Sequence, residues 1–171
     1  MEWTGQLEML AKVALAMLLG ALIGLERELA DKPAGLRTNM LVAGAAALLV
    51  ALGDTMVDRF AMRTTPDLLR SDPIRIIEAI ITGICFLGAG TLIVRRDREG
   101  QIEGLTTAAS ILFVAAIGVA VALVQIVLAV GVTVLVLITL RGMRVVDRWI
   151  GGRLAENESR SRPQRDGSRT E

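Results

Sequence analysis

The chain has 171 residues, of which 53% are apolar and 22% are charged, and its formal net charge is +1. It has no histidine, no tyrosine and one cysteine, Cys85, so a histidine-dependent triad, a histidine-ligated metal and an intramolecular disulfide are excluded. The charges lie in short blocks between long apolar runs, which is typical of a membrane protein, and the small net charge gives no reason to expect nucleic acid as a partner.

Three apolar stretches in the first hundred residues are long enough to be membrane helices. They are residues 7–25, 36–52 and 74–94. In the first stretch Glu8 and Lys12 are four residues apart, so they can pair on one face of a helix. Before the third stretch, Asp72 is a capping residue followed by proline at the first helical position. We also expect a short separate helix on the outer side, near residues 54–62.

The longest uncharged run extends from Leu105 to Leu140 and contains 36 residues. As one helix it would reach ~54 Å at the usual rise per residue. The hydrocarbon core of a bilayer is ~30 Å thick, so a single span cannot use the whole run. The run therefore predicts two spans, 105–121 and 125–140, joined by a turn at 122–125.

The basic residues predict how these five helices are threaded. Three arginines lie on the side of the N-terminus, and fourteen lysines and arginines lie on the opposite side. The positive-inside rule then predicts an all-α polytopic membrane protein with five transmembrane helices, its N-terminus outside and its C-terminus in the cytoplasm. We expect residues 1–154 to form the transmembrane domain. Residues 155–171 are rich in Arg, Ser and Glu, and we expect them to be a disordered cytoplasmic tail.

Under this threading, three polar segments meet at the cytoplasmic end of the bundle: residues 24–39, 83–91 and 104–110. Glu26 and Glu28 are two residues apart, so at most one of them faces the bundle. Either both are solvated flanks of the first helix, or Glu26 pairs with Arg37 in a compact polar site that also contains Thr106 and Thr107.

Glycines concentrate in the first and third predicted helices. Gly20 and Gly24 have the GxxxG spacing of closely packed membrane helices. Gly83, Gly88 and Gly90 lie within eight residues, and each costs ~1 kcal/mol relative to alanine in a helix interior. Close helix packing is one reason for them; the alternative is that they expose backbone carbonyls or admit a ligand beside the third helix.

Glu78 is the one acid well inside an apolar span. Arg75 precedes it by three residues, so Glu78 is either ion-paired and directed to the membrane surface or part of a cation or proton site. We expect Cys85 to be a small buried hydrophobe.

Five motifs occur in the order and spacing of the MgtC/SapB family, and over residues 10–140 the chain resembles that family. They are Gly24-Leu25-Glu26-Arg27-Glu28, Lys32-Pro33-Ala34-Gly35-Leu36-Arg37-Thr38, Asp72-Pro73-Ile74-Arg75, Gly83 with Phe86-Leu87-Gly88-Ala89-Gly90, and Gly104-Leu105-Thr106-Thr107-Ala108-Ala109-Ser110. The resemblance implies a multi-pass protein of the bacterial inner membrane, linked to growth in low magnesium and to virulence or acid stress.

The resemblance also implies which residues carry the function. The polar cluster comprises Glu26, Arg27, Glu28, Arg37, Thr38, Gly88, Gly90, Thr106 and Thr107, with Asp72 as a candidate on the outer side. Two features depart from the family pattern. Cys85 stands where we expect glycine, and we expect the chain to be a short form without the ACT-like C-terminal domain, since only about 30 residues follow the last predicted span.

Two functions follow from these observations. The first, which the resemblance implies, is a non-enzymatic membrane protein that acts in Mg²⁺-linked homeostasis or stress adaptation through other membrane proteins, such as ATP synthase; we also expect it to form a homo-oligomer, with a dimer favoured. The alternative is a transporter or channel for Mg²⁺ or another cation, in which Glu26, Glu28 and Glu78 are the candidate metal ligands. An enzyme would need a nucleophile with a base beside it, which the sequence does not indicate. No cofactor other than Mg²⁺ is expected.

Overall fold

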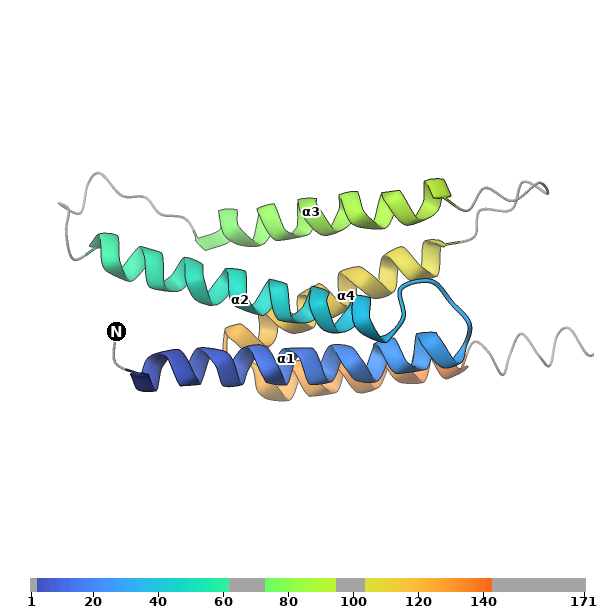
Figure 1. Ribbon diagram of the computed structural model, residues 1–171, viewed down its shortest axis with the longest axis horizontal. Helices are drawn as coiled ribbons and strands as arrows, with labels where there is room; N and C mark the ends of the chain where they lie inside the picture. Colours follow the sequence, from blue (N-terminus) through green and yellow to red (C-terminus); the bar gives the residue numbers. More distant parts are fainter. Residues whose placement is uncertain (1–2, 62–72, 95–103, 143–171) are drawn as a thin grey trace, which may run out of the picture. The chain divides into compact units, whose positions relative to one another are not determined.

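The computed structural model describes residues 3–61, 73–94 and 104–142, and all the secondary structure in these ranges is helical. The helices are α1 (Trp3–Leu29), α2 (Leu36–Ala61), α3 (Pro73–Val94) and α4 (Leu105–Ala122), followed by a fifth helix over Ile126–Gly142 (Figure 1). The prediction of an all-α chain with five helices is confirmed.

The chain divides into two compact units, residues 1–137 and residues 138–171. The packing described below is that of the first unit. In the second unit, residues 138–142 continue the fifth helix. The predicted tail, residues 155–171, lies outside the described residues, as does Asp72.

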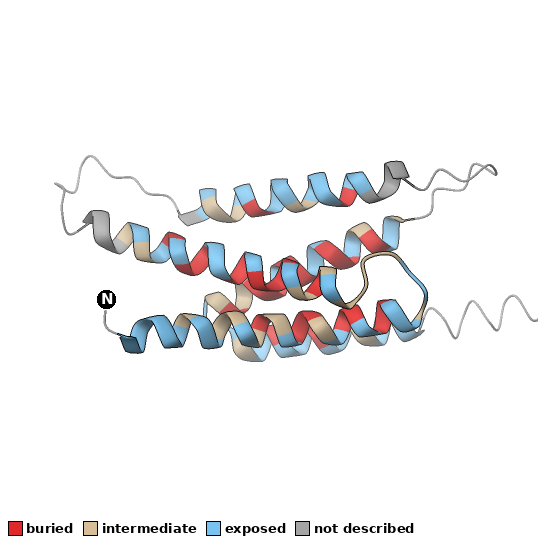
Figure 2. Cartoon of the chain, in the orientation of Figure 1, coloured by how far each residue is buried: buried red, intermediate tan, exposed pale blue. Residues whose placement is uncertain are grey.

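The core of the first unit is formed by α1, α2 and α4. α1 packs most extensively on α2, and α4 contacts both of them. Each helix buries residues that recur every three or four positions, which is one face of a helix. In α1 the first buried residue is Ala16, and the residues before it are exposed or half-buried (Figure 2). The buried hydrophobic face of α4 includes Ile111, Val114, Ile117 and Val121.

Glycines allow these three helices to approach closely at one level. A Cβ atom on Gly20 would lie 2.6 Å from the backbone oxygen of Asn39 and 2.9 Å from the Cβ atom of Ala43. A Cβ atom on Gly118 of α4 would overlap the carbonyl oxygen of the same Ala43. α2 is therefore held between a glycine of α1 and a glycine of α4. A Cβ atom on Gly24 would lie 2.7 Å from the Cα atom of Leu36, so close packing explains both glycines of the GxxxG motif.

α3 lies at the edge of this core, where it contacts α4 and, less extensively, α2. Its described residues bury only Ile80 and Gly88. A Cβ atom on Gly88 would be 3.2 Å from the Cβ atom of Ala108, whereas Gly83 and Gly90 have nothing within 4 Å. The expectation that Cys85 is buried is wrong, because α3 turns one narrow face to the core and Cys85 lies on another.

The second predicted span is longer in the structure than the sequence indicated. The expected separate helix near residues 54–62 is not formed, because α2 continues to Ala61. Gly53 does not interrupt it: this residue is buried, and a Cβ atom there would meet the side chain of Ile76. In α1 the predicted pair is confirmed, with Lys12 Nζ 2.9 Å from Glu8 Oε1.

The predicted turn at 122–125 is confirmed. Val124 has a φ of 61°, a left-handed conformation that is rare for a β-branched residue. The backbone N–H of Gln125 donates to the carbonyl of Ala120 at 2.9 Å, which closes the turn. The fifth helix then buries Ala129, Thr133 and Val136 at helical spacing.

Several helices are long and apolar enough to cross a membrane: Trp3–Leu29, Leu36–Val57 and Leu105–Ala122, with Ile126–Gly142 as a shorter apolar helix. Large apolar side chains are exposed along them and on α3, with Phe86 82% exposed and Val127 89% exposed. A soluble protein does not expose apolar surface of this extent to water, so these side chains contact lipid. The chain is a membrane protein.

Candidate functional site

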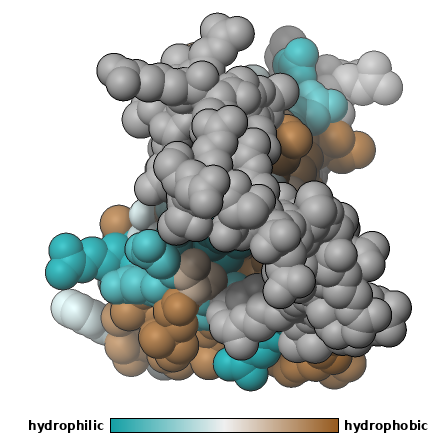
Figure 3. All heavy atoms as spheres, turned by 90° about the vertical axis from the view of Figure 1, so that its right-hand side faces the viewer, coloured by the Kyte–Doolittle hydropathy of each residue, from teal (hydrophilic) through white to brown (hydrophobic). Residues whose placement is uncertain are grey.

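The end of α1, the start of α2 and the start of α4 lie at the same end of the first unit (Figure 1). Figure 3 looks onto this end and shows hydrophilic residues gathered among hydrophobic ones. In these three segments five polar or charged side chains are buried: Glu26, Arg27, Asn39, Thr107 and Ser110. We call these five residues the buried polar cluster.

The cluster is centred on a contact between α1 and α4. Arg27 Nη2 donates a hydrogen bond of 2.6 Å to Thr107 Oγ1, and both side chains are buried. A hydrogen bond to a charged group contributes about 1.5–3 kcal/mol, more than one between neutral groups. Ser110 Oγ donates to the backbone oxygen of Thr107 at 2.8 Å, which ties a second hydroxyl to the first turns of α4. The contact thus joins the last turn of α1 to the first turn of α4.

Glu26 and Arg27 place two opposite charges at the buried end of α1. Glu26 is 3% exposed and Arg27 is 4% exposed, while Glu28 is exposed. Of the two glutamates, only Glu26 therefore faces the bundle. A buried charge is costly unless it is paired or hydrogen-bonded, and two opposite charges side by side leave the cluster without net charge.

Glu28 has a different role from Glu26, although the two residues are only two positions apart. Its Oε2 atom accepts a hydrogen bond of 2.8 Å from the backbone N–H of Leu36, the first residue of α2. The first turn of a helix has N–H groups without partners and favours negative charge, so Glu28 caps α2 from α1. Gly35 makes room for it, since a Cβ atom there would be 2.8 Å from Glu28 Oε2.

Asn39 is fully buried, and sequence analysis did not include it among the site residues. Its Nδ2 atom donates to the backbone oxygens of Ala34 at 2.5 Å and Gly35 at 2.9 Å. Because two carbonyls require N–H donors, the amide orientation is determined, and Oδ1 points away from them. Oδ1 is buried and has no hydrogen-bond partner within the described part of the chain. An asparagine one turn inside an apolar helix is the sequence signal that identifies this position.

Asn39 and Glu28 together hold the loop between α1 and α2. Two non-glycine residues of this loop have left-handed backbone conformations, Asp31 with a φ of 53° and Ala34 with a φ of 56°. Such conformations cost free energy for residues with a side chain, and the surrounding hydrogen bonds must maintain them. The backbone N–H of Lys32 also donates to the carbonyl of Arg27 at 3.0 Å, so the loop is anchored at the arginine of the cluster.

The remaining residues of the predicted cluster lie outside this buried core. Arg37 and Thr106 are exposed, Thr38 is half-buried, and Gly90 has open space around it. The arginine that contacts Thr107 is Arg27. The alternative in which Arg37 pairs with Glu26 in a compact site is wrong, because Arg37 is exposed and Glu26 is buried. The reason is helical geometry: the buried face of α2 contains Asn39 and Ala43, and Arg37 points about 200° away from Asn39.

The candidate metal ligands are not arranged as one ligand set. Glu26 is buried, while Glu28 and Glu78 are exposed. Glu78 is in the first half of α3, two residues after Ile76. Ile76 lines the same pocket as Lys12, near the start of α1, whereas Glu26 is near the end of α1. In the ranges that the structure describes, no three Asp, Glu, Cys or His side chains lie close enough together to hold a metal ion.

Helices that can cross a membrane, packed through glycines around a buried arginine–threonine contact, define a helical membrane protein. Within that class, the model of the MgtC family matches residues 13–149, and the chain belongs to this family. No solved structure matches the chain.

Curated relatives agree with this assignment. The chain is 44% identical over 123 residues to "Protein MgtC" of Salmonella typhimurium, which is 71% of this chain and 46% of that protein. It is 38% identical over 122 residues to "Protein SapB" of Bacillus subtilis, covering 70% and 50% of the two chains. It is 39% identical over 111 residues to the "Putative magnesium transporter YhiD" of Escherichia coli, covering 65% and 49%. The chain thus spans about half the length of these relatives.

Proposed function

We propose that this protein is a multi-pass protein of the bacterial inner membrane that acts in Mg²⁺-linked homeostasis or stress and virulence adaptation, without enzymatic activity. It acts by binding other membrane proteins, with a second copy of itself and a complex such as ATP synthase as candidate partners. Membership of the MgtC family and the magnesium transporter name of one relative support the link to Mg²⁺.

The observation that carries this proposal is that two charged side chains at the end of the bundle, those of Arg27 and Glu28, bind other groups of the protein. Arg27 binds Thr107, and Glu28 caps α2. Mg²⁺ prefers near-octahedral oxygen coordination, and such a set of carboxylates is absent from the described residues. These contacts hold α1, α2 and α4 together. A bundle held in this way can present a rigid helical surface to a partner.

α3 supplies that surface. It buries only Ile80 and Gly88 among its described residues, and Phe86 is 82% exposed. Membrane helices associate through small residues that let backbones approach, and Gly83 and Gly90 have open space around them. We therefore assign the outward side of α3 to helix–helix association in the bilayer.

The proposed threading has an N-terminus outside and the loop between α1 and α2 in the cytoplasm. It is tested by single cysteines in a Cys85→Ser background, labelled with a membrane-impermeant maleimide. Gln125→Cys, in the turn after α4, should react in spheroplasts, and Asp31→Cys should react only after lysis. Labelling of both residues from the same side contradicts the threading.

Transport of Mg²⁺ or another cation is the second candidate, because Glu26 is a buried carboxylate in a membrane bundle. The two functions are separated by flux into liposomes that contain the purified protein and a Mg²⁺-sensitive dye. Our proposal expects no flux above that of empty vesicles. Flux that Glu26→Gln abolishes, while Glu8→Gln leaves it intact, would establish transport in its place.

A test in cells complements the flux measurement. The protein should rescue growth in low Mg²⁺ of a bacterial strain that lacks its own family member. Glu26→Gln should impair this rescue at unchanged abundance in the membrane, and Arg37→Ala should be compared with it because Arg37 is exposed. Full rescue by Glu26→Gln would show that the carboxylate has no functional role.

A further inference from the structure

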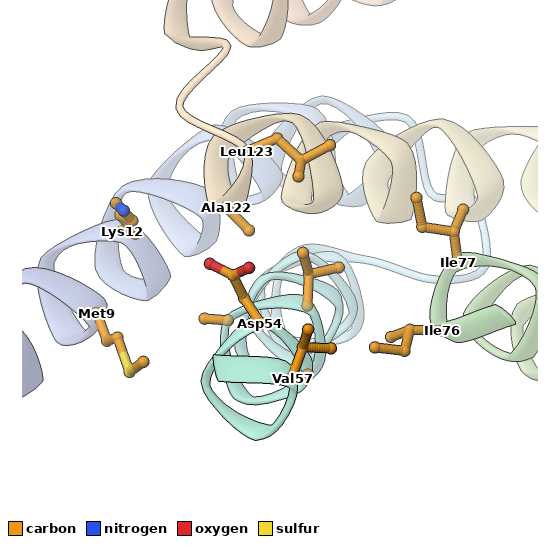
Figure 4. A pocket seen from close by; sticks show the side chains of 11 residues that line it. Met9, Lys12, Asp54, Val57, Ile76, Ile77, Ala122 and Leu123 are labelled. Carbon is orange, nitrogen blue, oxygen red and sulfur yellow. The ribbon is translucent and has the colours of Figure 1, made fainter. Parts of the chain in front are cut away.

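A pocket of about 120 Å³ is lined by residues of all four labelled helices (Figure 4), and none of them belongs to the buried polar cluster. Its walls are mostly apolar and include Met9 of α1, Val50 and Val57 of α2, Ile76 and Ile77 of α3, and Leu123 after α4. Its charged residues are Lys12 of α1 and Asp54 of α2. Lys12 precedes Arg27 by fifteen positions, so the pocket and the cluster are ~22 Å apart along α1.

The two charges in the pocket differ in their partners. Lys12 Nζ lies 2.9 Å from Glu8 Oε1, so its charge is already paired. Asp54 forms no ion pair with the residues that the structure describes. Its carboxylate points into the space between Lys12 and Ala122, as Figure 4 shows. The pocket therefore contains one carboxylate, on an exposed residue, that forms no ion pair with the lysine that lines the same pocket.

This carboxylate and these walls select a particular ligand chemistry. An anion would be repelled by Asp54. Mg²⁺ and Ca²⁺ need several oxygen ligands, and the pocket lining contains a single carboxylate. A primary ammonium group donates charge-assisted hydrogen bonds to a carboxylate, and an alkyl stem attached to it would contact the apolar walls.

We propose that this pocket binds a primary ammonium group carried on a short alkyl stem, with Asp54 as its counter-ion. The pocket is much larger than the about 10–15 Å³ that a single water needs, so it has room for several non-hydrogen atoms. A group of four or five non-hydrogen atoms fits this space. Two sources share the chemistry, a free alkylamine and the ethanolamine headgroup of a bilayer lipid, and the pocket does not depend on the function proposed above.

The first arm of the test uses n-butylammonium and the full chain in maltoside micelles, with binding measured by isothermal titration calorimetry. Wild-type protein should bind this probe saturably, and Asp54→Asn should weaken binding at least tenfold. Asp31→Asn is the matched control, since it removes one carboxylate from the loop beside the other end of α1. It should leave binding unchanged.

The second arm tests whether the ammonium group comes from the ethanolamine headgroup of a bilayer lipid. Protein extracted from bilayers of phosphatidylethanolamine and phosphatidylglycerol is analysed by native mass spectrometry. Selective retention of phosphatidylethanolamine by wild type, lost in Asp54→Asn, identifies the lipid as the occupant. Binding in the first arm alone identifies a free amine. Val57→Phe, which adds bulk to the wall, should reduce binding in whichever arm is positive.

Circular dichroism and gel filtration establish that each variant is folded. The proposal is overturned if folded Asp54→Asn behaves as wild type in both arms, or if neither arm detects binding to the wild-type protein. It is also overturned if Mg²⁺ competes with n-butylammonium at equal concentration, because the pocket then does not distinguish an ammonium group from a divalent ion.

Discussion

Arg27 of α1 and Thr107 of α4 are 80 positions apart in sequence and are joined by a buried hydrogen bond of 2.6 Å. Thr107 is in the first turn of α4, which follows Gly104, whose φ of 120° is in the region that favours glycine. The threonine hydroxyl that accepts the hydrogen bond from the arginine thus lies three residues after a glycine with a left-handed backbone conformation. This hydrogen bond joins the end of α1 to the start of α4, two of the three helices that form the core.

Thr107→Val tests this contact. Valine keeps the shape of threonine but removes the acceptor, so a charged donor loses a buried partner. We expect a loss of about 1.5–3 kcal/mol of stability, seen as a lower Tm in detergent. Thr106→Val is the matched control, because Thr106 is exposed, and it should change Tm little. Equal effects of the two substitutions would show that the hydrogen bond does not stabilise the bundle.

Gly20→Ala tests the close approach of α1 to α2. The new Cβ atom would lie 2.6 Å from the backbone oxygen of Asn39, and backbone cannot move aside as a flexible side chain does. Overpacking of this kind costs about 1–3 kcal/mol, so thermal unfolding should occur at lower temperature. Gly83→Ala on α3 meets nothing within 4 Å and should be neutral or stabilising by up to ~1 kcal/mol. Stabilisation by Gly20→Ala would contradict the packing described.

Glu28→Ala and Glu28→Gln separate the hydrogen bond of the cap from its charge. Alanine removes the acceptor for the N–H of Leu36 and should cost about 1 kcal/mol, as loss of a helix cap does. Glutamine retains an acceptor oxygen and should preserve most of that stability. Hydrogen exchange followed by mass spectrometry should show faster exchange in residues 30–36 of Glu28→Ala. Equally slow exchange in all three proteins would mean that Glu28 does not order the loop.

Asn39→Asp tests the role of the buried amide. Aspartate has nearly the same shape, but its carboxylate cannot donate to the carbonyls of Ala34 and Gly35. We expect a destabilised loop and weaker rescue of growth in low Mg²⁺. Asn39→Ala should have a smaller effect, since it removes the donor without adding a buried charge. Membrane abundance measured by immunoblotting distinguishes lost function from lost protein, and full rescue by Asn39→Asp would refute the assigned role.

The sequence predicts most of the helix ends to within a few residues. The two helices that share the uncharged run from Leu105 to Leu140 were separated by a length argument alone, and the turn lies where that argument put it. The exception is α2, which extends to Ala61 because Gly53 packs against Ile76 and does not end the helix. That contact with another helix is not visible in the local sequence.

The buried polar cluster was only partly predictable. Glu26, Arg27 and Thr107 were among the expected site residues, but the arginine placed in the compact site with Glu26 was Arg37, and Asn39 was not included. Spacing within one helix shows which residues share a face. It does not show which face is turned toward the next helix, and that rotation determines whether Arg27 or Arg37 is buried.

The sequence by itself determined the order of the five apolar helices and the GxxxG pair at Gly20 and Gly24, because bilayer thickness, charge and glycine spacing act within single segments. Only the tertiary structure decided that Ala43 is enclosed by Gly20 and Gly118, that Cys85 is exposed, and that Lys12 and Asp54 share a pocket. These features arise where different helices meet, and the steric fit of their backbones sets the rotation of each helix about its axis.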